Sequence, residues 1–345
     1  MSMTPLDPKF SFPLFCESSS TVNLGKNEKL IISDIWAFWD YVVKKSSKNA
    51  KERSFMASLL EQAKHFYLSA ENSPIKSQPL LYYYAFLNFS KILLVIKDNK
   101  FIGRDFYHGI GEKNNGKFIH SELNLFLNKQ NVNVASVLMG YLEPKNTNLP
   151  KSVNVKNILR HCVGVHRAYC EIYSEKEAFV RIQAGKLYKH GKELIWKAGL
   201  ATDSAQDIQK LSALGYTIEQ DEETKVYHWV EKIVMDSYSP TRADYASLSA
   251  LIREKGIWYF IGNSGHTLYV SKEANHRYSQ ESIIYLVMFY LGSITRYHPY
   301  LFEQIFSDKE QWLMSEFLST QPKQFLYLAT SRILGQSVLK AYASF

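Results

Sequence analysis

Two apolar stretches decide the fold of this chain: Leu80-Leu-Tyr-Tyr-Tyr-Ala-Phe-Leu-Asn-Phe-Ser-Lys-Ile-Leu-Leu94 and Ile283-Ile-Tyr-Leu-Val-Met-Phe-Tyr-Leu-Gly-Ser-Ile-Thr-Arg-Tyr-His-Pro299. Each is apolar almost all the way round, which a helix tolerates only when it packs on every side. Each also carries polar groups, which need hydrogen-bond partners in the interior. We therefore expect two buried helices, and we look for function at their polar residues.

The composition is that of a globular protein with a large core. The chain has 345 residues, of which 46% are hydrophobic, and this length allows one large domain or two intimate ones. The formal net charge of +8 permits a nucleic-acid partner without requiring one. The three cysteines form no CxxC pair, so neither a disulfide framework nor a thiolate zinc site is indicated.

The sequence predicts a cytoplasmic protein. Residues 1–15 hold three prolines and no uninterrupted apolar stretch, so no signal peptide is indicated. Asn88, Ser90 and Lys91 interrupt the apolar stretch 80–96, which falls short of the roughly 18 to 20 residues that span a bilayer. We expect no transmembrane helix.

Helical spacing of apolar residues alternates with strand-like spacing along the chain. The spacing predicts helices over 33–45, 53–70, 78–96 and 155–173, weak β or mixed structure over 123–141, and further helices from 279 onward. Between 177 and 270 short period-two runs appear, and the last two flank a hairpin loop at 262–265.

These patterns predict an α+β fold that is mainly a helical bundle with a small antiparallel β insert. The expected parts are an N-terminal arm (1–30), an N-terminal helical region (31–175), a β insert with short helices (176–275) and C-terminal helices (276–345). We expect the C-terminal helices to pack on the N-terminal ones, because the two apolar helices need partners that a small sheet cannot supply.

Several short motifs resemble the bacterial YaaC-like family. They are Tyr82-Tyr83-Tyr84 with Lys91, the loop His108-Gly109-Ile110, the helix 158–173, and Gly292-Ser293 with Arg296-Tyr297-His298-Pro299. The resemblance covers most of the chain and implies an architecture and a bacterial setting, but no reaction.

The first three helices also resemble those of HEPN proteins, helical bundles that often occur as nucleic-acid-associated or antiviral defence components. In ribonuclease members of that group, an Arg and a His with four to six residues between them form the site. Arg160 and His166 fit that spacing. This resemblance implies a metal-independent ribonuclease in which His166 acts as general base or acid on the RNA 2′-hydroxyl and Arg160 holds the phosphate.

On a straight helix, however, Arg160 and His166 point in directions about 120° away from a shared face. They could share a face only if the helix breaks between them, and Gly164 is the residue that could provide the break. Ordinary packing residues are the alternative interpretation.

Tyr84, Asn88 and Lys91 recur at i, i+4 and i+7 and therefore share one helix face. They suit a pocket for an anionic group, with Lys91 supplying charge and the other two supplying directional hydrogen bonds. A polar network in the bundle core, or a lysine whose amine reaches water, is the alternative. We expect Lys91 to be half-buried and to meet an acceptor from another element.

Arg296 and His298 end the second apolar helix just before Pro299. Cations there stabilise the helix dipole by about 0.3 to 1 kcal/mol, which makes capping one interpretation. A partly buried guanidinium is also suited to carboxylate or phosphate recognition, which makes binding the other.

The segment 181–197 interleaves basic and aromatic residues in a pattern that suits a single nucleic-acid strand. The candidates for such a surface are Lys186, Tyr188, Lys189, Lys192 and Trp196. A solvated hairpin face explains the same pattern.

The chain contains no dinucleotide-binding, P-loop, GxSxG or HExxH motif, so no cofactor or metal is predicted. Our first hypothesis is a binding or assembly subunit of a multi-protein system that handles or responds to nucleic acid. Its expected partner is another protein or a second copy of the chain. We expect no membrane partner. The second hypothesis is an enzyme, either the ribonuclease described above or a pocket built from Lys91, Arg296 and His298. Whether the protein is an enzyme is left open.

Overall fold

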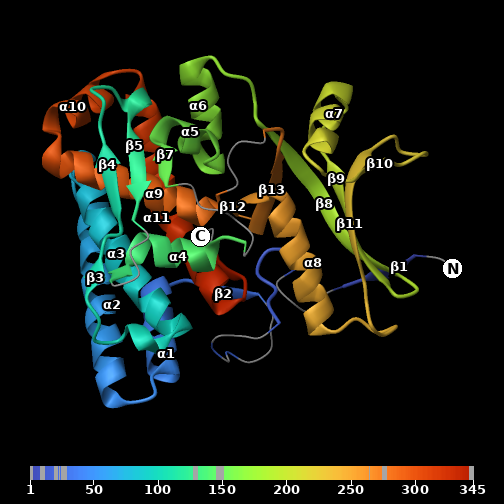
Figure 1. Cartoon of the computed structure of the whole chain (residues 1–345), viewed down its shortest axis with the longest axis horizontal. Coiled ribbons are helices and arrows are strands. Elements are labelled where there is room, and N and C mark those ends of the chain that lie inside the picture. The colour runs from blue at the N-terminus through green and yellow to red at the C-terminus, as the bar shows by residue number, and fades with distance from the viewer. Residues whose placement is uncertain are drawn as a thin grey trace. The chain divides into compact units, whose positions relative to one another are not determined.

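The structure is a computed structural model that describes residues 3–7, 12–18, 22, 24, 29–126, 131–144, 151–263, 265–273 and 278–341. The chain divides into two compact units (Figure 1). The helical unit comprises residues 32–177 and 278–333, and the sheet unit comprises residues 1–31, 178–277 and 334–345.

The helical unit is built from helices that come from both ends of the sequence. They are α1 (Ile35–Ser46), α2 (Ala50–Glu71), α3 (Gln78–Lys97), α4 (Val134–Leu142), α5 (Val155–Arg160), α6 (His166–Tyr173), α9 (Gln280–Tyr297), α10 (Pro299–Ser307) and α11 (Glu310–Leu334). Short 3-10 turns, η1 (Asn99–Phe101), η2 (Phe118–His120) and η3 (Val163–Val165), connect some of them.

Helices α3 and α9 are the two apolar stretches, and they lie against each other in the centre of this unit. Gly292 of α9 allows the close approach, because a Cβ at that position would lie 2.9 Å from Cβ of Tyr83 on α3. The ring of Phe86 on α3 stacks on Phe325 of α11 with centroids 4.1 Å apart. Together with α2, which also packs on α3, these helices bury 13 residues of α3, as a helix that is apolar on all sides requires.

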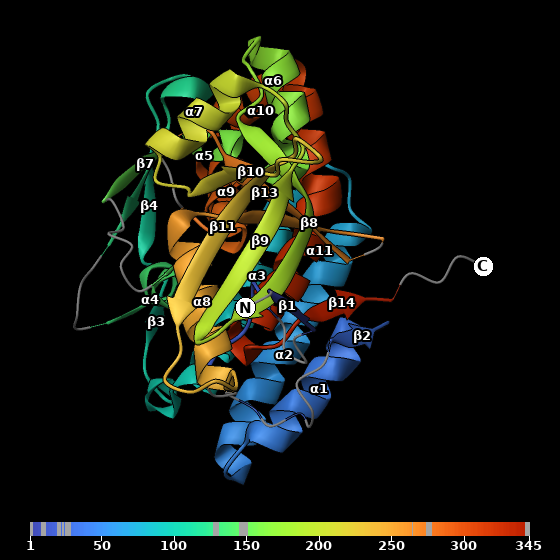
Figure 2. The same cartoon turned by 90° about the vertical axis from the view of Figure 1, so that its right-hand side faces the viewer.

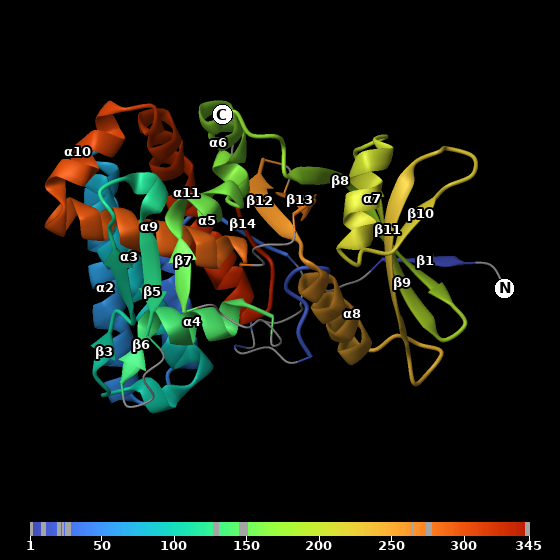
Figure 3. The same cartoon turned by 45° about the horizontal axis from the view of Figure 1, so that its top comes forward.

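Two small sheets complete the helical unit. Strands β4 (Ile110–Lys113), β5 (Glu122–Leu125) and β7 (Ser152–Asn154) pair antiparallel (Figure 3). Strand β3 (Phe106–Tyr107) pairs parallel with β6 (Val132–Asn133), which leads directly into α4. The stretch predicted as mixed structure thus contains parts of β5, all of β6 and most of α4.

The sheet unit contains a seven-stranded antiparallel sheet (Figure 2). Its strand order is β10-β11-β9-β8-β13-β12, and β1 pairs with the far end of β8. The strands are β1 (Thr4–Leu6), β8 (Phe179–His190), β9 (Glu193–Leu200), β10 (Ile218–Gln220), β11 (Tyr227–Val234), β12 (Trp258–Gly262) and β13 (Gly265–Ser271). The predicted hairpin between β12 and β13 is confirmed by the pairing of Gly262 with Gly265; Ser264 in its loop lies outside the described residues.

Helix α8 (Arg242–Lys255) packs on β9 and β11 and buries Leu248 and Ile252 completely. Helix α7 (Ala205–Ala213) precedes β10. A separate two-stranded sheet joins β2 (Leu30–Ile32) to β14 (Val338–Lys340), so segments from both ends of the chain belong to this region.

The predicted fold, mainly a helical bundle with a small antiparallel β insert, is wrong in its proportions. The structure is about 52% helical and 21% strand, with one large curled antiparallel sheet. The short period-two runs predicted short strands, whereas β8 has 12 residues and β9 and β11 have 8 each.

Small residues within these strands made part of their length hard to predict from the sequence. Gly185 lies diagonally across from Trp196, and a Cβ on Gly185 would come within 2.8 Å of the indole Nε1. A glycine usually weakens a strand, but here it makes room for a large cross-strand ring.

Within the described part of the chain, α3 is the one helix that is long and apolar enough to cross a membrane by composition. Of its most apolar window, 72% is buried inside the protein. This is the behaviour of a core helix and is consistent with the expectation that it spans no membrane.

Candidate anion-binding site

The packing of α3 against α9 brings together two of the predicted site residues, although they are about two hundred positions apart. Nη1 of Arg296 donates to the hydroxyl of Tyr84 at 2.6 Å, and Nη2 donates to the hydroxyl of Tyr297 at 2.5 Å. The guanidinium carbon also lies 4.6 Å from the centroid of the Tyr297 ring. Arg296 is exposed and not partly buried as expected, and among the described residues no ion pair joins its guanidinium to a carboxylate.

His108 extends this site from the loop between β3 and β4. The hydroxyl of Tyr83 lies 2.5 Å from Nδ1 of His108, and the two rings stack. Gly109 adopts a positive φ of 71°, and a Cβ there would lie 2.6 Å from Cβ of Asn133. Only glycine meets both conditions, so Gly109 sets the position of the neighbouring His108.

The protonation of this pair follows from burial. Burial raises the pKa of Tyr83 far above its usual range, so its hydroxyl stays protonated and donates to Nδ1 of His108. Partial burial lowers the pKa of His108, and the positive charges of Arg296 and Lys91 lower it further. A neutral ring that accepts at Nδ1 carries its hydrogen on Nε2, which makes Nε2 a donor.

Lys91 is the second cation of the site. Its amine donates to Oδ1 of Asn88 at 3.1 Å and lies 5.8 Å from the centroid of the Phe106 ring. The side-chain amide of Asn88 in turn donates to Gln62 of α2 at 3.3 Å. Lys91 is half-buried, and burial lowers its pKa.

The prediction that Lys91 meets an acceptor from another element is wrong, because its amine donates to Asn88 one turn earlier on the same helix. Among the described residues no carboxylate lies within 4.0 Å of this amine either.

We call Tyr84, Asn88, Lys91, His108 and Arg296 the cationic cluster. Aromatic rings surround it: Phe66 of α2 stacks on Tyr84 with centroids 5.4 Å apart, and Phe55 stacks on Phe106 at 6.4 Å. The shared face of Tyr84, Asn88 and Lys91 was predicted from helical spacing. The contribution of His108 was missed as a site residue, although the glycine after it signalled an unusual backbone position.

His298 does not join the cationic cluster. Its Nε2 lies 3.6 Å from Oε1 of Glu112 on β4, and its backbone N–H closes the end of α9. The His298 ring therefore faces a carboxylate, in contrast to Arg296.

Arg160 and His166 lie on either side of a break in the predicted helix 155–173. Helix α5 ends at Arg160, and α6 begins at His166. The guanidinium of Arg160 binds the carboxylate of Glu175 and the carbonyl of Lys176. Nδ1 of His166 meets the backbone carbonyl of Arg160 at 2.6 Å, and its Nε2 faces Cys170 and Glu177.

The His166 ring is 4% exposed. A general base has to reach the proton that it abstracts, so this arrangement does not favour the ribonuclease hypothesis.

The predicted nucleic-acid surface on the sheet is not continuous. Trp196 is 2% exposed and packs edge-on against Trp229, so its ring cannot stack on a base. Lys186 is exposed and lies opposite Lys197, and Tyr188 is half-buried. Lys189 is half-buried on the neighbouring position of β8, and the amine of Lys192 donates to the carbonyl of Asp236 at 2.9 Å. This pattern is that of a solvated hairpin with a buried tryptophan.

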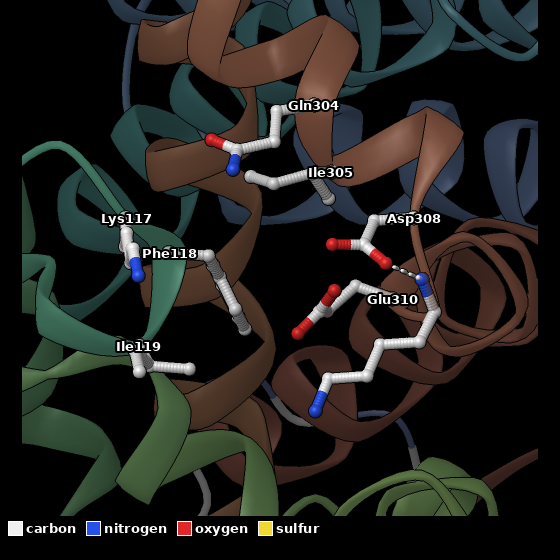
Figure 4. A pocket seen from close by; sticks show the side chains of 8 residues that line it. Lys117, Phe118, Ile119, Gln304, Ile305, Asp308 and Glu310 are labelled. Carbon is white, nitrogen blue, oxygen red and sulfur yellow. Dashed lines mark hydrogen bonds between the residues drawn. The ribbon is translucent and has the colours of Figure 1, made fainter.

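The helical unit also contains a hollow of about 220 Å³ beside α10 (Figure 4). The carboxylates of Asp308 and Glu310 point toward it, and Glu310 accepts a hydrogen bond from Tyr173 at 2.9 Å. Its walls are Lys117, Phe118, Ile119, Gln304, Ile305, Asp308, Lys309 and Glu310. None of the residues of the cationic cluster lines this hollow.

The fold and the cationic cluster define a two-unit α+β protein whose helical unit carries Lys91 and Arg296 beside His108. The family model of the YaaC-like proteins matches residues 15–333, and the chain belongs to that family. Neither the curated proteins nor the solved structures gave a match. The resemblance of the first helices to HEPN proteins stays a hypothesis.

Proposed function

We propose that the protein is a cytosolic binding subunit whose cationic cluster recognises the phosphate groups of a single-stranded nucleic acid. The observation that carries this proposal is the gathering of Arg296 and Lys91 around one histidine, with hydroxyl and amide oxygens as their acceptors. Cations held together without carboxylates repel each other, and a bound anion relieves that repulsion.

The hydrogen-bond donors of the cluster suit a phosphate. Arginine is well adapted to phosphate recognition because its planar fork offers several donors in fixed directions. Here two of these donors are held by neutral phenol oxygens, which orients the guanidinium without neutralising it. Nε2 of His108 and the amine of Lys91 supply further donors.

The surrounding rings favour a nucleic acid over a simple inorganic anion. Proteins that bind single strands combine a positive groove with aromatic side chains on which bases stack. Phe66 and Phe106 are half-buried beside the cluster, and Tyr297 is 60% exposed. The ribonuclease hypothesis remains the alternative, and no contact of His166 favours it.

Fluorescence anisotropy with a labelled single-stranded oligonucleotide tests the proposal. A hydrogen bond to a charged group contributes about 1.5 to 3 kcal/mol, so Arg296→Ala and Lys91→Met should each weaken binding about tenfold or more. Each lost phosphate contact should also reduce the slope of log K against log salt by about 0.7.

Lys64→Met is the matched control. Lys64 is an exposed lysine on α2, two residues from Gln62, so it lies on a different helix face from the cluster. The proposal fails if the wild-type protein does not bind the oligonucleotide, or if Lys64→Met weakens binding as much as Lys91→Met.

A further inference from the structure

His166, Cys170 and Glu177 gather three metal-ligating atoms at the helix break between α5 and α6. Their Nε2, Sγ and carboxylate oxygen all lie within 4.8 Å of one another. His166 opens α6 and Cys170 follows one turn later, so both lie on one face. Ser174 adopts a left-handed conformation with φ of 51°, which ends α6 and lets the chain bring Glu177 back to the same face.

The orientation of His166 is that of a metal ligand. Its Nδ1 lies 2.6 Å from the carbonyl of Arg160, which can only accept, so Nδ1 carries a hydrogen and donates. This leaves Nε2 to face the thiol of Cys170 at 3.3 Å and Oε1 of Glu177 at 2.5 Å. Metal-bound histidines commonly donate their other ring N–H to a backbone carbonyl, which fixes tautomer and ring orientation.

The distances agree with a tetrahedral zinc site after a small movement. Bond lengths of about 2.0 to 2.3 Å place nitrogen and sulfur about 3.6 Å apart, and nitrogen and oxygen about 3.3 Å apart. The observed distance from Nε2 to Sγ is 3.3 Å. The carboxylate of Glu177 would have to move outward by about 0.8 Å, and its side chain is 45% exposed and has room to move.

We propose that His166, Cys170 and Glu177 bind a zinc-class divalent transition metal ion, with water in the fourth position. One nitrogen, one sulfur and one oxygen ligand suit Zn²⁺ better than Mg²⁺ or Ca²⁺, which prefer oxygen ligands alone. The partly exposed Glu177 provides the entry path, while His166 and Cys170 are buried. The bound ion ties both ends of α6 together, and it is independent of the cationic cluster.

The test uses the full chain after treatment with a chelator. Titration with Zn²⁺ should show one site per chain, and Zn²⁺ should raise the melting temperature because only the folded state brings the ligands together. Co²⁺ should give a thiolate-to-cobalt charge-transfer band in the near ultraviolet, which reports the Cys170 ligand directly.

Three variants separate a metal site from a simple hydrogen-bonded cluster. Cys170→Ser should lose the charge-transfer band. Glu177→Gln, at a partly exposed position that should not disturb folding, should bind Zn²⁺ at least about tenfold more weakly, because even loss of an outer partner of a ligand costs about 10 to 100-fold. Glu171→Gln, an exposed acid on α6 that pairs with Arg167, should bind as the wild type does.

The proposal is overturned if Zn²⁺ at micromolar concentration neither binds nor stabilises the wild-type chain. It is equally overturned if Glu177→Gln and Glu171→Gln bind Zn²⁺ alike, or if a charge-transfer band persists in Cys170→Ser.

Discussion

Gly292→Ala tests whether the close approach of α3 and α9 holds the site together. In an unobstructed helix this change is favourable by about 1 kcal/mol, since glycine is the poorer helix former. Here the new Cβ would lie 2.9 Å from Cβ of Tyr83 and 3.3 Å from the carbonyl oxygen of Pro79. Carbon atoms pack best at about 3.5 to 4.0 Å, so the two helices must move apart by roughly 0.6 Å or more.

Overpacking of a core costs about 1 to 3 kcal/mol, which exceeds the gain in helix propensity. We therefore expect a net loss of about 1 kcal/mol in the free energy of unfolding. The same movement displaces Tyr84 from Arg296, so oligonucleotide binding should weaken as well.

Gly140→Ala on α4 is the matched control, because Gly140 is exposed and a Cβ there meets nothing within 4 Å. This variant should gain up to about 1 kcal/mol. Urea unfolding gives the change in the free energy of unfolding for each variant relative to the wild type. The difference between the two changes isolates the cost of the contact with Tyr83. Equal stabilisation of the helical unit by both substitutions would refute the reasoning.

Three further outcomes follow from the structure. Arg296→Lys should impair oligonucleotide binding nearly as much as Arg296→Ala, because the two phenol contacts need the guanidinium fork; binding equal to that of the wild type would return Arg296 to a capping role. Burial raises the pKa of Glu143 to about 7 from 4.5, so the folded state holds an extra proton between these pH values. Stability should therefore fall by about 3 kcal/mol as pH rises from 4.5 to 7 and then level off. Glu143→Gln should remove this part of the urea-unfolding pH profile, and an unchanged profile would contradict the assignment. In the structure the indole N–H of Trp39 donates to the buried hydroxyl of Thr330 at 2.9 Å. Trp39→Phe removes this donor and should destabilise the protein by about 1 to 3 kcal/mol. An unchanged urea midpoint would show that the hydrogen bond contributes nothing to stability.

Local sequence determined the helices of this protein well. The predicted helix 78–96 corresponds to α3 (Gln78–Lys97), and the predicted helix 53–70 lies within α2 (Ala50–Glu71). Helical periodicity is a property of neighbouring residues, so it can be read without knowing what packs against it. The same periodicity placed Tyr84, Asn88 and Lys91 on one face.

The extent of the sheet could not be read in this way. Strands β8 and β9 contain Gly185, Ala198 and Gly199, which disfavour strands locally. They are stable as strands because partners from distant segments supply the hydrogen bonds, including β1 from the N-terminus. Strand propensity depends on such cross-strand neighbours, and the sequence alone does not name them.

The sequence by itself determined which residue types were available for an anion site: a lysine and an asparagine on one apolar helix, and an arginine at the end of another. Only the tertiary structure decided that Arg296 meets Tyr84, that His108 joins them, and that His298 turns instead to Glu112. The physical reason is that each contact depends on how distant segments pack: Arg296 reaches Tyr84 where α3 and α9 approach closely at Gly292, and His108 is positioned by Gly109. Contacts between residues two hundred positions apart leave no periodic signal in the chain.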